Sequence, residues 1–177
     1  MIVPGGMQGA SMKWSKLKQR IEVGFADAVK GRVEVWSTRY RKAHDEFGEG
    51  WITVDGEKVH GIGSTRFLID YWQESEQLSN QEGLSSLEAW GEAKRHLHAE
   101  GNMALWAFNA ALFDYLSLPF DRILASEVAL IRALGMLDRR LGKRRLAHMD
   151  TSAEPDLVRR LHRFRCECEG LRPAEGV

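Results

Sequence analysis

The sequence predicts an α+β fold, in which an N-terminal helix and a three-stranded antiparallel meander are followed by a helical C-terminal half. Apolar residues recur at three- and four-residue steps near the start of the chain and through its second half, which is typical of amphipathic helices. Between these regions, two short apolar runs flank Asp55-Gly56, a dipeptide typical of a two-residue hairpin turn. One small sheet with helices packed on it gives a single α+β domain.

The domain organisation follows from length and composition. The chain has 177 residues, of which 44% are hydrophobic and 28% charged, and this favours one domain with a packed core. We interpret residues 1–11, rich in glycine and small side chains, as a flexible N-terminal extension. Residues 12–177 then form a single α+β domain, with the helix and meander in residues 12–62 and the helical part in residues 63–171.

The first helix is expected over residues 14–29, because an apolar stripe follows a helical period there and Gly31 can cap the last turn. The stripe consists of Trp14, Leu17, Ile21, Phe25 and Val29. A strand is expected over residues 32–41. Val33 and Val35 would face one side of it, and Trp36, Thr38 and Tyr40 the other.

The hairpin turn at Asp55-Gly56 fixes an expected register, in which Val54 lies opposite Glu57, Thr53 opposite Lys58, Ile52 opposite Val59 and Trp51 opposite His60. Ile52, Val54 and Val59 would form an apolar side of the sheet. We expect the first helix to cover that side. We expect the later helices to pack on the second side, which carries Trp51 and His60.

The second half of the chain reads as consecutive helices with recognisable starts. Ser64 or Thr65 can cap a helix that reaches about residue 78, and Ser85 can cap one that ends near Gly101, with Leu87, Trp90 and Leu97 facing inward. Further helices are expected from Asn102 to before Pro119, over residues 120–141 with a break near Ser126, and from Ser152 onward with Pro155 in the first turn.

The stretch from Leu130 to Leu146 combines an apolar face with the densest positive charge of the chain. Leu130, Leu134, Leu137 and Leu141 share one helical face. Five cations follow within seven positions: Arg139, Arg140, Lys143, Arg144 and Arg145. They suit binding to the phosphate backbone of a nucleic acid. The alternatives are a solvated helix end and docking on an acidic part of the same chain. If Gly142 ends the helix, Lys143, Arg144 and Arg145 lie in a loop.

The charge of the chain is unevenly distributed although its formal net charge is zero. Residues 1–42 carry nine Lys/Arg against three Asp/Glu, residues 43–120 four against thirteen, and residues 121–177 twelve against nine. The basic ends and the acidic middle either neutralise each other within the fold or present patches of opposite sign.

A second candidate binding site lies on the polar side of the predicted sheet. Its members would be Trp36, Tyr40, Trp51, Lys58 and His60, which could stack on bases or on a small ligand. Alternatively, Tyr71, Trp72 or Trp106 from the helices buries this side as part of the core.

Catalytic and metal sites have weaker support in the sequence. His96 and His98 diverge on a helix, so they cannot share one ion, and Glu92 with His96 is a single pair at helical spacing. His44 and Asp45 lie in an expected loop, where catalytic groups often occur. Neither a nucleotide-binding glycine loop nor the acid-x-lysine pattern of a nuclease strand is present. We therefore expect no metal and no cofactor.

The cysteines and the apolar runs indicate the compartment. Cys166 and Cys168 lie two residues apart in a helical stretch, where their side chains diverge, so no disulfide is expected. No apolar run has membrane-spanning length, and the first residues lack the pattern of a secretory signal. We expect a cytoplasmic protein that does not enter a membrane.

Three blocks of the sequence resemble a family of small uncharacterised bacterial proteins. They read WSKLKQRIE, KGRVEVWSTRYRKAHDEFGEGWITVDG and LIRALGMLDRRLGKRRL, and the resemblance covers most of residues 12–171. It implies a bacterial protein, with a natural start near Met12. It brings no activity, cofactor or catalytic residue with it.

The sequence as a whole favours binding over catalysis. We expect a binding or regulatory protein that acts by protein–protein interaction, with an unknown protein partner or as a homodimer. One alternative is a nucleic-acid-binding protein that uses residues 139–145. A second is an enzyme with a site near His44, Asp45 and His60. An exposed apolar patch would favour protein binding. A cluster of Arg39, Arg41 and Lys42 with residues 139–145 would favour nucleic-acid binding. A buried histidine–carboxylate pair would favour an enzyme.

Overall fold

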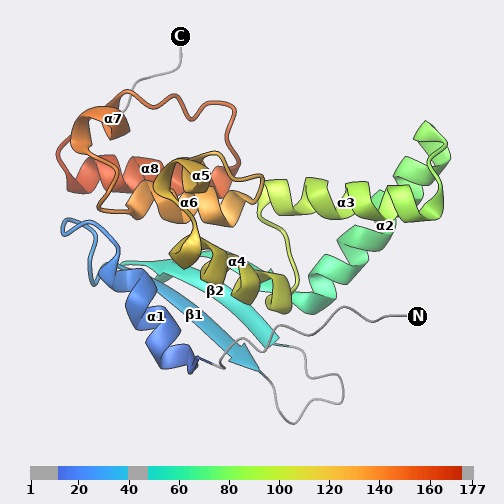
Figure 1. Ribbon diagram of the computed structural model, residues 1–177, viewed down its shortest axis with the longest axis horizontal. Coiled ribbons are helices and arrows are strands. Elements are labelled where there is room, and N and C mark those ends of the chain that lie inside the picture. The colour runs from blue at the N-terminus through green and yellow to red at the C-terminus, as the bar shows by residue number, and fades with distance from the viewer. Residues whose placement is uncertain (1–11, 40–47, 173–177) are drawn as a thin grey trace.

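The computed structural model describes residues 12–39 and 48–172, and it confirms the α+β fold (Figure 1). The elements in chain order are α1 (Trp14–Val23), β1 (Val33–Arg39), β2 (Gly48–Val54), β3 (Glu57–Gly63), α2 (Ser64–Glu82), α3 (Ser86–Glu100), α4 (Leu105–Ser117), α5 (Phe120–Leu124), α6 (Ala129–Leu137), α7 (Lys143–Ala147) and α8 (Asp156–Cys168). Among the helices in these ranges, none is both long and apolar enough to cross a membrane.

The three strands form an antiparallel meander in the order β1-β2-β3. Asp55 and Gly56 turn with positive φ values of 50° and 84°, as this type of hairpin requires. The pairs next to the turn, Val54 with Glu57 and Thr53 with Lys58, are those that the sequence predicts.

Beyond these pairs the predicted register is wrong, because a bulge shifts the pairing between Thr53 and Ile52. Ile52 lies opposite His60, and Trp51 lies opposite Gly61. Val59 is the extra residue on β3, and one extra residue moves every later side chain to the other face. His60 therefore shares the face of Ile52 and not that of Trp51.

The helical half packs on the apolar face of the sheet, and not on the second face as expected. Val35, Ile52 and Ile62 are buried on that face, and Gly50 lies directly under the ring of Phe108 from α4. Helix α1 lies along the outer edge of β1 (Figure 1), where an Oε1 atom of Glu22 accepts a hydrogen bond from the backbone N–H of Val35 at 3.0 Å. Glu22 thereby satisfies a donor that the edge strand would otherwise leave unpaired.

Helix α1 ends at Val23, six residues earlier than the apolar stripe predicts. The next residues pair instead with the end of α6: the N–H of Ala26 donates to the carbonyl of Leu137, and the N–H of Arg139 donates to the carbonyl of Gly24. Phe25 and Val29 are still fully buried. The stripe thus predicts which residues enter the core but not where the helix stops.

The expected helix over residues 120–141 is divided twice. The first division, between Leu124 and Ala129, lies near Ser126 as predicted. The second follows Leu137, where residues 138–142 form a turn and Gly142 precedes the short helix α7. The predicted apolar face is nevertheless confirmed, since Leu130, Leu134, Leu137 and Leu141 are all fully buried.

Helices α2 and α3 form an antiparallel hairpin that extends away from the rest of the molecule (Figure 1). We call this hairpin, residues 64–100, the arm. Two small apolar clusters hold it together, one around Leu78, Ala89 and Ala93 and one around Phe67 and Leu97, which also includes Ala104 beyond the arm. At the tip, Ser85 and Glu88 form a capping box that fixes the start of α3.

Replacing Gly50 with alanine tests the packing of α4 on the sheet. The added Cβ would lie 2.6 Å from a ring carbon of Phe108, so we expect the free energy of unfolding to fall by about 1–3 kcal/mol. Gly91→Ala is the matched control: Gly91 is exposed within α3 with open space around it, and alanine should stabilise the helix by up to about 1 kcal/mol. Denaturant unfolding measures both changes. A Gly50→Ala protein as stable as the parent would contradict this packing.

Candidate functional site

The five cations between residues 139 and 145, which we call the basic segment, are mostly paired with carboxylates of their own chain. Arg140 contacts Asp138 with an Nη2–Oδ2 distance of 2.7 Å, Lys143 contacts Glu169 at 2.7 Å, and Arg145 contacts Asp121 at 3.3 Å. These carboxylates come from residues 121–177 and not from the acidic middle of the chain. Pairing of this kind reduces the positive charge that the segment can offer to a polyanion.

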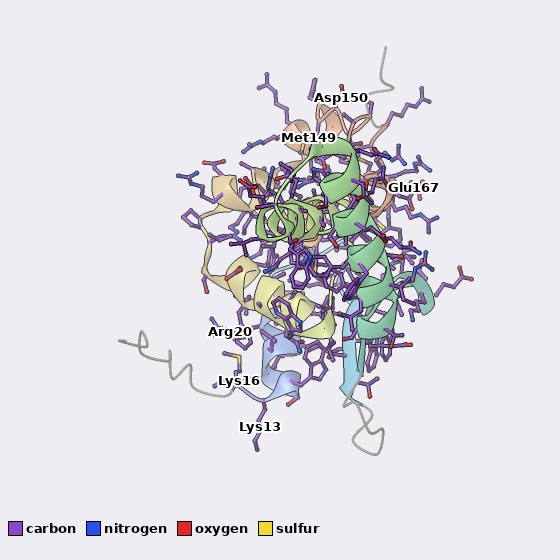
Figure 2. All side chains as sticks on the ribbon, turned by 90° about the vertical axis from the view of Figure 1, so that its right-hand side faces the viewer. Lys13, Lys16, Arg20, Met149, Asp150 and Glu167 are labelled. Atoms are coloured by element: carbon purple, nitrogen blue, oxygen red, sulfur yellow. The ribbon has the colours of Figure 1, made fainter. Side chains whose placement is uncertain are left out.

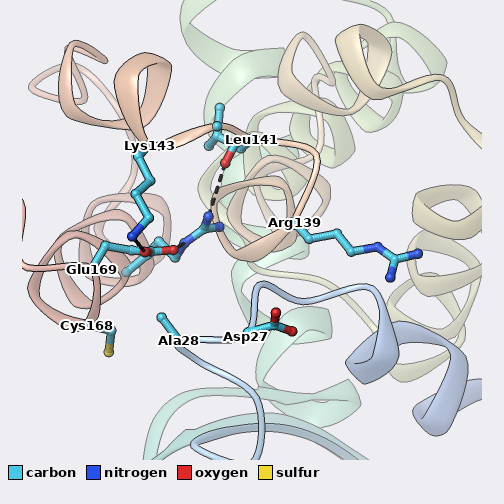
Figure 3. A pocket seen from close by; sticks show the side chains of 9 residues that line it. Asp27, Ala28, Arg139, Leu141, Lys143, Cys168 and Glu169 are labelled. Atoms are coloured by element: carbon cyan, nitrogen blue, oxygen red, sulfur yellow. Dashed lines mark hydrogen bonds and ion pairs between the residues drawn. The ribbon is translucent and has the colours of Figure 1, made fainter.

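The two other cations of the basic segment, Arg139 and Arg144, are exposed. Within residues 12–39 and 48–172, neither forms an ion pair. The side chain of Arg139 points away from Lys143 and Glu169 (Figure 3). Arg41 and Lys42, which would extend a basic surface, lie outside the described residues. Among the described residues, the unpaired positive charge of the basic segment is therefore confined to Arg139 and Arg144.

The turn below the basic segment is held by a buried arginine. Arg165 is 2% exposed, and its Nη1 atom donates to the carbonyls of Met136 and Asp138 at 3.1 and 3.0 Å. Its Nη2 atom donates to the carbonyl of Leu141 at 3.1 Å. Its Nε atom donates to Glu169 at 3.1 Å. This planar cation therefore fixes three backbone carbonyls at the end of α6 and in the turn that follows it.

Hydrogen bonds of the Asp138 carboxylate also hold this turn in place. The carboxylate accepts a hydrogen bond from the hydroxyl of Tyr115 at 2.8 Å, and from the Nε and Nη2 atoms of Arg140. Although burial acts in the opposite direction, the hydrogen bonds from Arg140 and Tyr115 hold the pKa of Asp138 below its usual range. Burial, reinforced by Asp138, raises the pKa of Tyr115 well above its ordinary value.

A hollow of about 530 Å³ opens between this turn, the segment after α1 and the end of α8 (Figure 3). Most charged side chains that line it form ion pairs within the chain. Lys143 and Arg165 both contact Glu169, and Asp27 contacts Lys30 at 2.6 Å. The hydrogen bond from Lys143 lowers the pKa of Glu169. Burial raises the pKa of the Cys168 thiol, which keeps it in its unreactive, protonated form at neutral pH. The polar groups of the hollow thus serve the fold.

The face of the sheet opposite the helical half carries Trp36 and Trp51 side by side. They lie directly opposite each other on β1 and β2, with ring centroids 6.2 Å apart and planes inclined by 14°. The Nζ atom of Lys18 lies 3.4 Å from the ring centroid of Trp36, and that of Lys58 lies 5.4 Å from the ring centroid of Trp51. Trp36 is only 37% exposed. Lysines of the same chain therefore occupy the positions over the rings that a stacking ligand would need.

The structure thus brings together only some of the residues of the predicted aromatic site. Trp36 and Trp51 come together, but the bulge in β3 places His60 on the opposite face, where its Nε2 atom donates to the carbonyl of Gly101 at 3.0 Å. Burial lowers the pKa of His60. Tyr40, His44 and Asp45 lie outside the described residues.

A larger exposed surface lies where the sequence analysis expects core residues. Leu87 and Trp90, expected to face inward, are 83% and 48% exposed, and Trp72 is 65% exposed. A hairpin of two helices buries only the stripe between them, and among the described residues no third element covers the rest. Most large exposed apolar side chains lie on the arm or on α4: Leu68, Ile69, Trp72, Leu87, Trp90, Trp106 and Phe113.

The arm points towards the viewer in Figure 2, and aromatic rings of its two helices lie together beside a shallow groove. The ring centroids of Trp72 and Trp90 are 6.3 Å apart, and the edge of Tyr71 supports Trp90 at 6.1 Å. The groove has a volume of about 290 Å³, and both tryptophans line it. Its other lining residues are Ser75, Glu76, Ser79, Asn80 and Ser86. We call the exposed apolar side chains beside it, Leu68, Trp72, Leu87 and Trp90, the arm surface.

The arm also has a pronounced charge. Residues 64–100 carry three Lys/Arg and seven Asp/Glu, which gives a formal charge of −4. One carboxylate joins the two helices, since Glu74 of α2 contacts His96 of α3 at 3.0 Å; Glu92 of α3 contacts the same imidazole at 3.0 Å. Glu76 is exposed and lines the groove. The arm therefore combines the exposed apolar side chains of the arm surface with a net negative charge, part of which Glu76 brings to the groove.

Comparison with known proteins identifies one family. The model of the SF0329 protein family matches residues 13–166, from the start of α1 through most of α8. No curated protein and no solved structure matches the chain.

Replacing Tyr115 with phenylalanine tests the fastening of the turn. Loss of the buried hydrogen bond to Asp138 should lower the free energy of unfolding by about 1–2 kcal/mol at neutral pH. Because the pKa of Tyr115 is raised in the folded state, its stabilisation is complete below about pH 10, the ordinary tyrosine pKa, and falls as the pH rises further. Denaturant unfolding between pH 7 and 11 should show a flatter decline for Tyr115→Phe. An equally steep decline in both proteins would contradict the assignment.

Proposed function

The chain belongs to the SF0329 protein family, and we propose that it is a binding protein whose arm docks a protein partner through the arm surface. The observation that supports this most strongly is the exposure of Trp72 at 65% and Leu87 at 83% on a hairpin that extends from the body. Monomeric proteins rarely expose contiguous large apolar groups without a binding role. Tryptophan is also enriched among the anchor residues of protein interfaces.

The arm is suited to binding because its own contacts keep it rigid. The small side chains of Ala89 and Ala93 let α2 and α3 approach closely, and the contact between Glu74 of α2 and His96 of α3 joins the two helices. The αL conformation of Gly83 and the capping box at Ser85 fix the tip. A preorganised surface loses little conformational entropy on binding, so more of the contact energy contributes to affinity.

Nucleic-acid binding has less support among the described residues. Arg140, Lys143 and Arg145 are already paired with carboxylates. The cations of α1 lie at one end of the molecule, whereas Met149 and Asp150, which follow α7, lie at the other (Figure 2). The described positive charges therefore do not join into one stripe along which a phosphate backbone could run.

Catalysis also has less support than binding. His60, the one predicted catalytic residue inside the described ranges, is directed at the carbonyl of Gly101 on the helix-covered face. In the hollow beside α7, Lys143 and Arg165 are paired with Glu169, and the pKa of the Cys168 thiol is raised. Binding through the arm uses groups that the fold leaves without another role.

Site-specific photo-crosslinking in the native host tests this function. A photoreactive phenylalanine analogue at position 72 or 87 should give discrete covalent adducts with a protein, because both positions lie on the arm surface. The same analogue at Phe113, an exposed aromatic position on α4 outside the arm, is the control. Adducts at 113 but not at 72 or 87, or adducts with nucleic acid at the arm positions, would contradict the proposal.

A further inference from the structure

We propose that the segment bound by the arm is a basic amphipathic helix, which lies along the groove between α2 and α3. This inference rests on the proposed function and specifies the chemistry of the partner. It depends on three features of the arm: the shape of its groove, the spacing of its exposed apolar residues and the sign of its charge.

The groove can accept apolar side chains of a protein partner, because two exposed tryptophans form part of its lining. Its volume is about 290 Å³. The hydroxyls of Ser75 and Ser79 already donate to the carbonyls of Trp72 and Leu84, at 3.0 and 3.2 Å. The rings of Trp72 and Trp90 pack against each other and form the apolar part of the lining. An apolar side chain packed on their exposed faces would leave the hydroxyls of Ser75 and Ser79 paired.

The exposed apolar residues have the spacing of a helix-packing seam. Leu68 and Trp72 are four residues apart on α2, and Leu87 and Trp90 are three apart on α3, so each pair shares one helical face. Two antiparallel helices with such neighbouring rows form ridges and a groove that accept a third helix. Helix-in-groove binding uses apolar anchors at the same three- and four-residue steps.

The charge of the arm selects a basic partner over a second copy of the chain. With a formal charge of −4 on residues 64–100, two arms packed together would bring like charges close to each other. Lysine or arginine at the flanks of a partner helix would instead face Glu76 beside the groove and the acidic residues of the tip, Glu82 and Glu88.

The distribution of charge along the arm also orients the partner. The tip carries Glu82 and Glu88 and no cation, whereas at the base Asp70, Glu92 and Glu100 are balanced by Arg66, Lys94 and Arg95. Lys94 lies over the ring of Trp106 from α4, 5.1 Å from its centroid, at the base of the arm. The cationic flanks of the bound helix should therefore concentrate towards the tip of the arm.

Fluorescence anisotropy with three labelled synthetic peptides tests this inference on the full chain. One is a helix-forming peptide with leucines on one face and lysines at the flanks, the second has glutamate in place of lysine, and the third is a scrambled leucine–lysine sequence. We expect the first to bind at least about tenfold more tightly than the other two, which corresponds to about 1.4 kcal/mol. Added salt should weaken its binding.

Two substitutions and their controls locate the binding. Trp72→Ala should weaken binding of the lysine peptide about tenfold or more, whereas Phe113→Ala should leave it unchanged. Glu76→Lys should weaken the lysine peptide and strengthen the glutamate peptide, whereas Glu127→Lys, on an exposed residue of the body, should do neither. All substituted residues are exposed, and circular dichroism checks that each variant is folded.

Each other outcome overturns the inference in a recognisable way. Equal binding of the lysine and glutamate peptides removes the charge selection but leaves protein binding by the arm intact. Equal binding of the scrambled peptide shows non-specific attraction. A dimer in sedimentation experiments that Trp72→Ala dissociates identifies a second copy as the occupant. Failure of the proposed function itself is seen separately, as a lack of protein adducts at positions 72 and 87.

Discussion

The guanidinium of Arg165 lies buried under the turn between α6 and α7, and the rest of the body depends on the hydrogen bonds that it donates. It pairs with the carbonyls of Met136, Asp138 and Leu141 and with the carboxylate of Glu169. A buried cation without these partners would cost several kcal/mol, so the turn and α8 hold each other in place. This turn and the end of α6 form backbone hydrogen bonds with residues 24–26. The carboxylate of Asp138 in the turn accepts a hydrogen bond from Tyr115 of α4.

This arrangement separates a tightly fastened body from an arm with small cores of its own. The main core takes in residues from α1, the sheet and helices α4 to α8, whereas the two clusters of the arm use mostly its own residues. Several charges of the body join its own segments, as when Arg32 contacts Asp55 and Arg132 contacts Glu154. The arm, by contrast, exposes tryptophan and leucine side chains that the contact between α2 and α3 does not use. Structural and binding roles therefore fall on different parts of the chain.

Features that depend on neighbouring residues could be predicted from the sequence, and features that depend on distant partners could not. The Asp55-Gly56 turn, the start of α3 at Ser85 and the buried leucine face from Leu130 to Leu141 follow local rules. The early end of α1 and the break after Leu137 arise from pairing between these two segments and from Arg165. For Trp72 and Trp90, helical spacing identifies an apolar stripe. It does not reveal whether a third element covers it.

The most direct test of the central claim is quantitative co-purification from the native host with three forms of the chain. These are the parent, a Trp72→Ser/Trp90→Ser variant of the arm surface, and an Arg139→Ala/Arg144→Ala variant of the basic segment. If the arm binds the partner, the arm variant should lose a protein that the parent and the basic-segment variant both retain. Retention of every protein by the arm variant, together with loss of a protein or nucleic acid from the basic-segment variant, would contradict the account.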